Sequence, residues 1–109
     1  MAKAVFFQAG ESLDYTNSGD STIEANSVVA FGQRVGVAGC DILPGETGSL
    51  HMTGVFYLPV AEAVSAGALL YWDATGGKVT ATSTGNIPAG FAAAACSADD
   101  TLVLVKING

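Results

Sequence analysis

Short apolar runs alternate along the chain with small clusters of glycine and polar residues. The run at 69–72 holds the only tryptophan, and a glycine pair at 76–77 separates it from a second run at 78–80. A run this short, bounded by glycines, indicates a strand, a tight turn and a return strand. By the same reasoning we expect strands at 4–7, 13–16, 28–31, 34–38, 49–58, 69–72, 78–80, 92–95 and 102–107.

The segment 49–58 has the clearest alternation in the chain. Leu50, Met52, Phe56 and Leu58 share one side of an extended backbone, because side chains of a strand point alternately to opposite faces. We predict one strand here, ending at Pro59, with Phe56 and Leu58 in the core.

Two segments are open to a helical interpretation. Residues 60–65 have room for one helical turn, and the alanine run at 92–95 is composed of the best helix former. The alanine run is bounded by Gly90 and Ser97 and lies between strands, so we predict a strand there too. Little or no helix is expected.

Eight or nine short strands at this spacing are typical of a sandwich, a jelly roll or a barrel. We predict an all-β fold, with one β-sandwich domain over 1–109 and an extended N-terminal strand within 1–16. A weak internal similarity relates 26–38 to 67–81, where a buried run meets a turn and then a basic residue followed by valine. It fits either a repeated β unit or chance in a strand-rich chain.

Composition narrows the classes of function. Four basic residues face ten acids, and a net charge of −6 argues against a phosphate-binding surface for nucleic acid. The only cysteines, Cys40 and Cys96, lie far apart; a disulfide is possible, but two free, partly buried thiols in a reducing compartment fit better. The start of the chain lacks a signal-peptide pattern and no run is long enough to span a membrane, so we expect a soluble protein.

Candidate chemistry is sparse. Residues 45–48 look superficially like a phosphate-binding loop, but they lack the lysine and the following helix that such a loop needs. His51 is the only histidine and fits a surface or interface position, while Asp99 and Asp100 fit a solvated turn better than a cation site. We therefore expect no enzyme activity, no cofactor and no metal.

Tyr71 and Trp72 are neighbours on a predicted strand, so their rings point to opposite faces. One ring should face the core, and the other should lie at an edge, at an interface or under a loop. A sugar-stacking platform is the alternative for this pair, and an open, flat Trp72 ring would favour it.

Several stretches together resemble the phage capsid cement (decoration) protein family, some members of which are labelled as recombinases. The resemblance covers nearly the whole chain, and the matching stretches lie at 1–6, 13–17, 34–38, 41–48, 54–59, 66–73, 77–79 and 103–107. The lysine missing from 45–48 and the short chain give the recombinase label no support.

The resemblance implies a jelly-roll sandwich that binds the outside of a phage head and fastens neighbouring major capsid subunits together, with no catalytic residues. It also implies location on the capsid exterior of the virion, after synthesis in the cytoplasm of the bacterial host. The alternative function is a carbohydrate-binding β module displayed on the virion.

A cement protein must contact several neighbours, so we expect a homo-oligomer, a dimer first and a trimer second. Partners other than the major capsid protein (nucleic acid, membrane, small-molecule substrate) are not expected. The predicted partner-binding residues are Val5, Phe6, Phe7, Tyr71 and Trp72. The run 4–7 is either a bridging strand that adds to a neighbour or an edge strand of its own sandwich.

Overall fold

The computed structural model describes residues 2–6 and 8–109, which form nine strands and no helix. The predicted all-β class is confirmed. The strands are β1 (Ser12–Thr16), β2 (Val28–Phe31), β3 (Arg34–Ala38), β4 (Thr47–His51), β5 (Val55–Pro59), β6 (Leu69–Asp73), β7 (Lys78–Thr80), β8 (Ile87–Ala92) and β9 (Leu102–Ile107).

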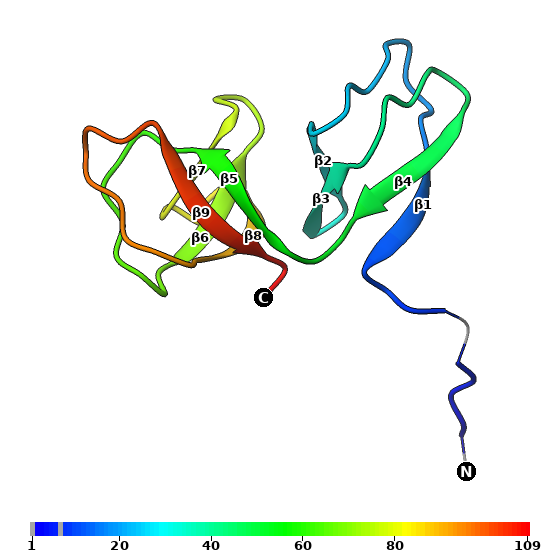
Figure 1. The fold of residues 1–109 in the computed structure, drawn as a ribbon, viewed down its shortest axis with the longest axis horizontal. Coiled ribbons are helices and arrows are strands. Elements are labelled where there is room, and N and C mark those ends of the chain that lie inside the picture. The colour runs from blue at the N-terminus through cyan, green and yellow to red at the C-terminus, as the bar shows by residue number, and fades with distance from the viewer. Residues whose placement is uncertain (1, 7) are drawn as a thin grey trace.

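The strands form two antiparallel sheets in a sandwich-like arrangement, seen as two lobes in Figure 1. The first sheet has the order β1-β4-β3-β2, and the second has the order β5-β9-β8-β6-β7. Each sheet is thus built from consecutive strands of the chain. This strand order does not confirm the jelly-roll part of the prediction.

The two sheets repeat one arrangement of four strands. When β1, β4, β3 and β2 are matched with β5, β9, β8 and β6, the orders agree, and β7 is left over as an insertion between β6 and β8. We call residues 11–52 the first unit and residues 54–107 the second unit. In each unit the first strand pairs with the last, as in a Greek key traced in reverse.

Backbone hydrogen bonds repeat with the strands. In the first unit Ile23 and Ile42 exchange two N–H···O=C bonds as an isolated bridge; in the second, Val64 and Cys96 do the same. Each of these four residues is followed by a turn, closed by the Ser27, Glu46, Ala68 and Asp100 amides. The repeated backbone pattern shows that the units share their loops as well as their strands.

The internal similarity read from the sequence is therefore half right. β2 and β6 are equivalent, as the similarity between 26–38 and 67–81 indicated. Its second halves are not equivalent, because β3 corresponds to β8, whereas Lys78–Thr80 is the inserted strand.

The single strand predicted over 49–58 is wrong. The chain ends β4 at His51, passes Gly54 with a φ of 127°, and begins β5 in the other sheet. The predicted alternation still holds for burial, since Leu50 and Leu58 are buried and Phe56 packs partly against the core. Alternation describes which side of the backbone faces inward, and it does not reveal that the chain has changed sheets.

Other boundaries also differ from the predictions. Residues 60–65 form no helical turn but carry two bridge residues, Val60 and Val64. The predicted strand at 92–95 is wrong beyond Ala92, because β8 ends there and the chain bends. Residues 4–6 are not in a strand, and Phe7 lies outside the described residues.

The main core joins the two units. Val35 and Val37 of β3 pack with buried residues of the second unit, among them Leu58, Leu70, Val79 and Val105. Asn108 fastens the same seam: its side-chain amide donates to the carbonyls of Val35 (2.7 Å) and Met52 (2.8 Å), and its backbone N–H donates to Ala89. The first unit is therefore held against the second by both apolar packing and one amide.

Candidate partner-binding surfaces

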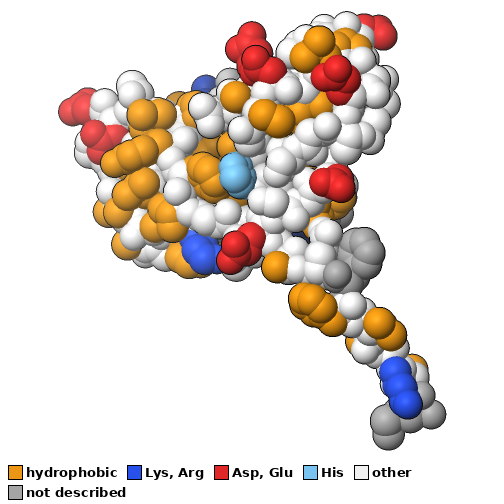
Figure 2. All heavy atoms as spheres, turned by 45° about the vertical axis from the view of Figure 1, so that its right-hand side comes forward, with side chains coloured by type: hydrophobic (Ala, Val, Ile, Leu, Met, Phe, Trp, Pro, Cys, Tyr) orange, Lys and Arg blue, Asp and Glu red, His pale blue; other side chains and the backbone are white. Residues whose placement is uncertain are grey.

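The N-terminal arm, residues 2–6, projects away from both sheets (Figure 1). Val5 is 90% exposed and Phe6 is 84% exposed. Large apolar side chains this open are uncommon on an isolated protein, because leaving them in water forgoes about 1.5–3 kcal/mol each. The arm also carries a basic residue, Lys3, and Figure 2 shows apolar side chains of the arm standing clear of the body.

A second apolar surface covers the outer side of β5 and β9. Val55 is 52%, Tyr57 68% and Leu102 49% exposed, and Leu104 faces Tyr57 across the two strands. We call these four residues the outer β5–β9 face. Hydrophobic side chains also gather over this lobe in Figure 2. Val55 and Tyr57 alternate along β5 with the predicted core residues Phe56 and Leu58, and none of the four residues of this face was among the predicted partner-binding residues.

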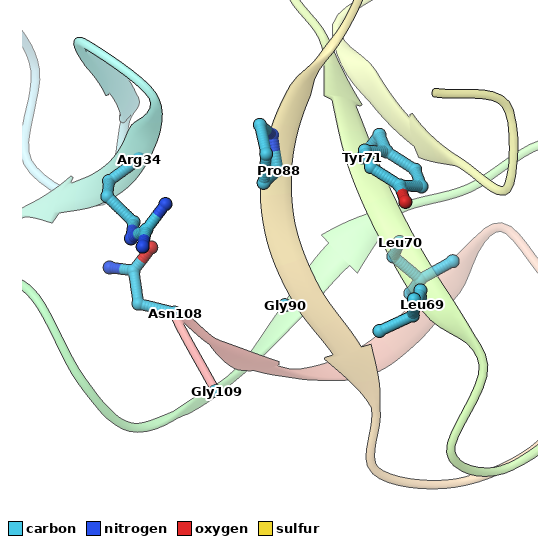
Figure 3. A pocket seen from close by; sticks show the side chains of 8 residues that line it. All are labelled: Arg34, Leu69, Leu70, Tyr71, Pro88, Gly90, Asn108 and Gly109. Carbon is cyan, nitrogen blue, oxygen red and sulfur yellow. The ribbon is translucent and has the colours of Figure 1, made fainter. Parts of the chain in front are cut away.

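Tyr71 lines a pocket of about 250 Å³ at the seam between the units (Figure 3). Arg34 of β3 and Asn108 contribute one side of it, while Leu69 and Tyr71 of β6 contribute another. Sequence reasoning could not connect Arg34 with Tyr71, because only the packing of β3 against β8 brings them to one pocket.

Trp72 is half-buried and packs against the core cluster. Tyr71 and Trp72 face opposite ways, as predicted, with the indole toward the core. An indole in that position does not present the open, flat face that would favour sugar stacking.

The predicted site residues are not brought together. Val5 and Phe6 lie on the arm, whereas Tyr71 and Trp72 lie on β6 in the second unit. Phe7, the fifth predicted residue, lies outside the described residues. The arm and the β6 residues are thus separate candidate surfaces.

The residues considered above for catalysis, phosphate binding or metal binding lie in ordinary strands and turns. His51 is exposed on β4, 3.5 Å from the Ser12 hydroxyl, and Asp100 accepts a hydrogen bond from the Ser97 amide within a turn. Residues 45–48 span a turn and the start of β4, so no helix follows them. Within residues 2–6 and 8–109, no three His, Cys, Asp or Glu side chains gather as a metal site, and no helix is long and apolar enough to cross a membrane.

Both cysteines are free, as predicted. Cys40 is exposed rather than partly buried, and Cys96 is half-buried with its thiol donating to the Glu62 carbonyl.

The arm and the outer β5–β9 face thus expose apolar side chains on an all-β scaffold. A family model described as phage cement protein matches residues 7–107. The chain belongs to the phage cement protein family. The resemblance read from the sequence is confirmed. No curated protein and no solved structure matches the chain.

Family membership gives the protein a structural role associated with a phage capsid. In that setting the exposed arm and the outer β5–β9 face are the apolar surfaces for which partners must be sought.

Proposed function

We propose that the protein binds the outer surface of the phage head and cements neighbouring major capsid subunits. The observation that carries this proposal is the family match over nearly the whole chain, combined with apolar surfaces that no other part of the described chain covers. The proposed role is mechanical and includes no catalytic step.

The outer β5–β9 face is the proposed contact with the head. It is built on two paired strands, so its backbone is fixed before binding and loses little entropy when the contact forms. A surface of Val55, Tyr57 and Leu102 offers an aromatic anchor among aliphatic neighbours, a composition typical of interface centres.

The arm is the proposed bridging element, through Val5 and Phe6 and, from the sequence, Phe7. An apolar segment with free backbone groups can add a strand to a neighbour while its side chains enter pockets. Self-association follows as part of the proposal, with a dimer as first choice and a trimer as second.

The test is binding to empty, expanded heads, measured by co-sedimentation, together with the heat resistance of the heads. The wild-type protein should bind and raise the temperature at which heads break. A Val55→Asp/Tyr57→Asp variant should bind about 10–100-fold more weakly, because charges would be buried at the contact.

Leu43→Asp is the matched control, since Leu43 is 48% exposed but lies on the first unit, away from this face. Deletion of residues 1–7 completes the set: a shortened protein that stays folded but no longer fastens heads supports the bridging role. Heads that gain no heat resistance from saturating wild-type protein would refute cementing.

The carbohydrate-binding alternative has a separate assay. The half-buried position of Trp72 does not favour it. Retention of the protein on immobilised cell-surface polysaccharide, lost in a Trp72→Phe variant that still folds, would support that alternative over a cement role.

A further inference from the structure

In the second unit, β7 closes the sheet on itself. β7 pairs antiparallel with β6 on one side, and on the other side Val79 forms a parallel bridge with Val60, directly after β5. Glu62 of the same loop accepts hydrogen bonds from the Thr80 hydroxyl (2.6 Å) and the Ala81 amide (3.2 Å). Val79 is consequently only 1% exposed.

Within the described residues, the first unit has no strand in the equivalent place. There β2 pairs only with β3, although the sheet is rolled so that its two edges approach one another. The rings of Tyr15 on β1 and Phe31 on β2 show this approach, with centroids 6.3 Å apart. A hollow of about 520 Å³ lies along β2, and its lining includes Tyr15, Glu24, Val28, Val29 and Ala30.

Burial at equivalent positions shows what the missing strand would cover. Leu58 and Leu70 are 3% and 1% exposed in the second unit, whereas their counterparts Tyr15 and Val29, which line the hollow, are only half-buried. Away from the hollow the units agree: Leu50 and its counterpart Val105 are both fully buried. At these positions the interior of the first unit is more open than that of the second on the side of the hollow, and equally buried away from it.

The backbone of β2 can accept a strand at this place. A two-residue turn joins Phe31 to Arg34, and in such hairpins alternate pairs exchange hydrogen bonds. Phe31 and Val29 bond toward β3, so Val28 and Ala30 direct their N–H and C=O groups outward. An added strand that has the same direction as β7 runs antiparallel to β2 and parallel to β1.

We propose that this strand is residues 3–6 of a second copy of the chain, laid along β2 in the first unit. Val5 and Phe6 are exposed and outside any strand, and Lys3 supplies a positive charge to a hollow that carries Glu24. The arm thus matches the apolar and basic character of the inserted strand Lys78–Thr80.

The direction of the strand excludes the arm of the same chain. Residues 7–11 join the arm directly to β1, so the arm can fold back easily only antiparallel to β1. A parallel arrangement needs a crossover connection of about a dozen residues or more. Two copies that exchange arms form a closed dimer, and three that pass arms around a ring form a trimer. This inference deepens the proposed self-association and does not depend on attachment to the head.

Disulfide trapping tests the contact directly. In a Cys40→Ser/Cys96→Ala background, Ala4, Val5 and Phe6 are changed to cysteine one at a time, and each is mixed with an Ala30→Cys protein. Mild oxidation should give a mixed disulfide dimer, strongest for arm positions that share one face. Tyr57→Cys, at a position that is also exposed but lies on the second unit, is the control and should give only background cross-linking.

A pair of variants tests the backbone. Ala30→Pro removes an outward N–H, a change that an edge strand tolerates, whereas Ala30→Ser keeps it. By light scattering, Ala30→Pro should weaken self-association about tenfold, the effect of one lost hydrogen bond, and Ala30→Ser should not. Circular dichroism verifies that both variants fold. If Ala30→Pro does not fold, the disulfide trapping alone tests the contact.

The inference is overturned if no arm cysteine joins position 30 above the Tyr57→Cys background, even where the protein binds heads. The opposite outcome, a specific cross-link in a protein that does not bind heads, would refute the proposed function and leave this contact standing.

Discussion

The two units of this protein share one strand order but differ in how they are closed. The second unit carries its own closing strand, β7, and its interior residues Leu58 and Leu70 are almost inaccessible. The first unit lacks that strand, and its counterparts Tyr15 and Val29 remain half-buried. The same topology thus provides a closed sheet in the second unit and an open edge strand in the first.

The largest expected effect separates two equivalent glycines. Gly90 of β8 has a φ of 142°, and a Cβ there would collide with the Lys106 carbonyl oxygen of β9, which cannot move without breaking the sheet. Gly36 of β3 would meet only the Leu50 side chain. We expect Gly90→Ala to cost about 4–5 kcal/mol or more and Gly36→Ala about 1–3 kcal/mol in urea unfolding. Equal costs would mean that the β9 backbone beside Gly90 yields as readily as the Leu50 side chain beside Gly36.

A smaller effect is expected from truncating equivalent interior residues. Leu70→Ala should cost about 2–5 kcal/mol, as for a buried leucine, while Val29→Ala should cost about 1 kcal/mol because Val29 is half-buried. Unfolding should be measured at low and high protein concentration. If a second copy covers β2, the cost of Val29→Ala rises with concentration and that of Leu70→Ala does not; no change for either would count against the closing contact.

A third prediction concerns the seam between the units. Asn108→Gly keeps the positive φ of 55° but removes the amide that donates to Val35 and Met52, and should cost about 1–3 kcal/mol. Asn26→Gly is the control, because Asn26 also has a positive φ but lies exposed in a turn. Trp72 fluorescence reports the second unit alone, and circular dichroism reports both. In Asn108→Gly the two unfolding curves should separate; coincident curves would show that apolar packing alone couples the units.

Local chemistry made several elements predictable. The hairpin of β2 and β3, and the strand, turn and return strand of β6 and β7, follow from apolar runs broken by glycine-containing turns. The opposite directions of Tyr71 and Trp72 follow from strand geometry alone. The family could also be recognised from the sequence, because several short stretches resemble the family in their order and spacing along the chain.

The candidate site was only partly predictable. Val5 and Phe6 could be selected as apolar residues near an end, and they are exposed. The hollow beside β2 could not, because it depends on the distance between two sheet edges that are separated in sequence by a long loop. The role of Asn108 could not be predicted from the sequence, because an asparagine after a strand is common. Its hydrogen bonds to Val35 and Met52 are seen only in the folded chain.

Local sequence was enough to predict the strand-sized segments, their inward and outward faces and the lack of a phosphate-binding lysine at 45–48, because each depends on residues close together in the chain. The passage of 49–58 from one sheet to the other, the two equivalent units and the closure of one of them by β7 become visible only in the folded chain. The two units have few residue types in common at equivalent positions. What they have in common is backbone hydrogen bonds between residues far apart in the chain, such as Ile23 with Ile42 and Val64 with Cys96. Almost any side chain is compatible with such bonds, so the sequence carries little trace of them.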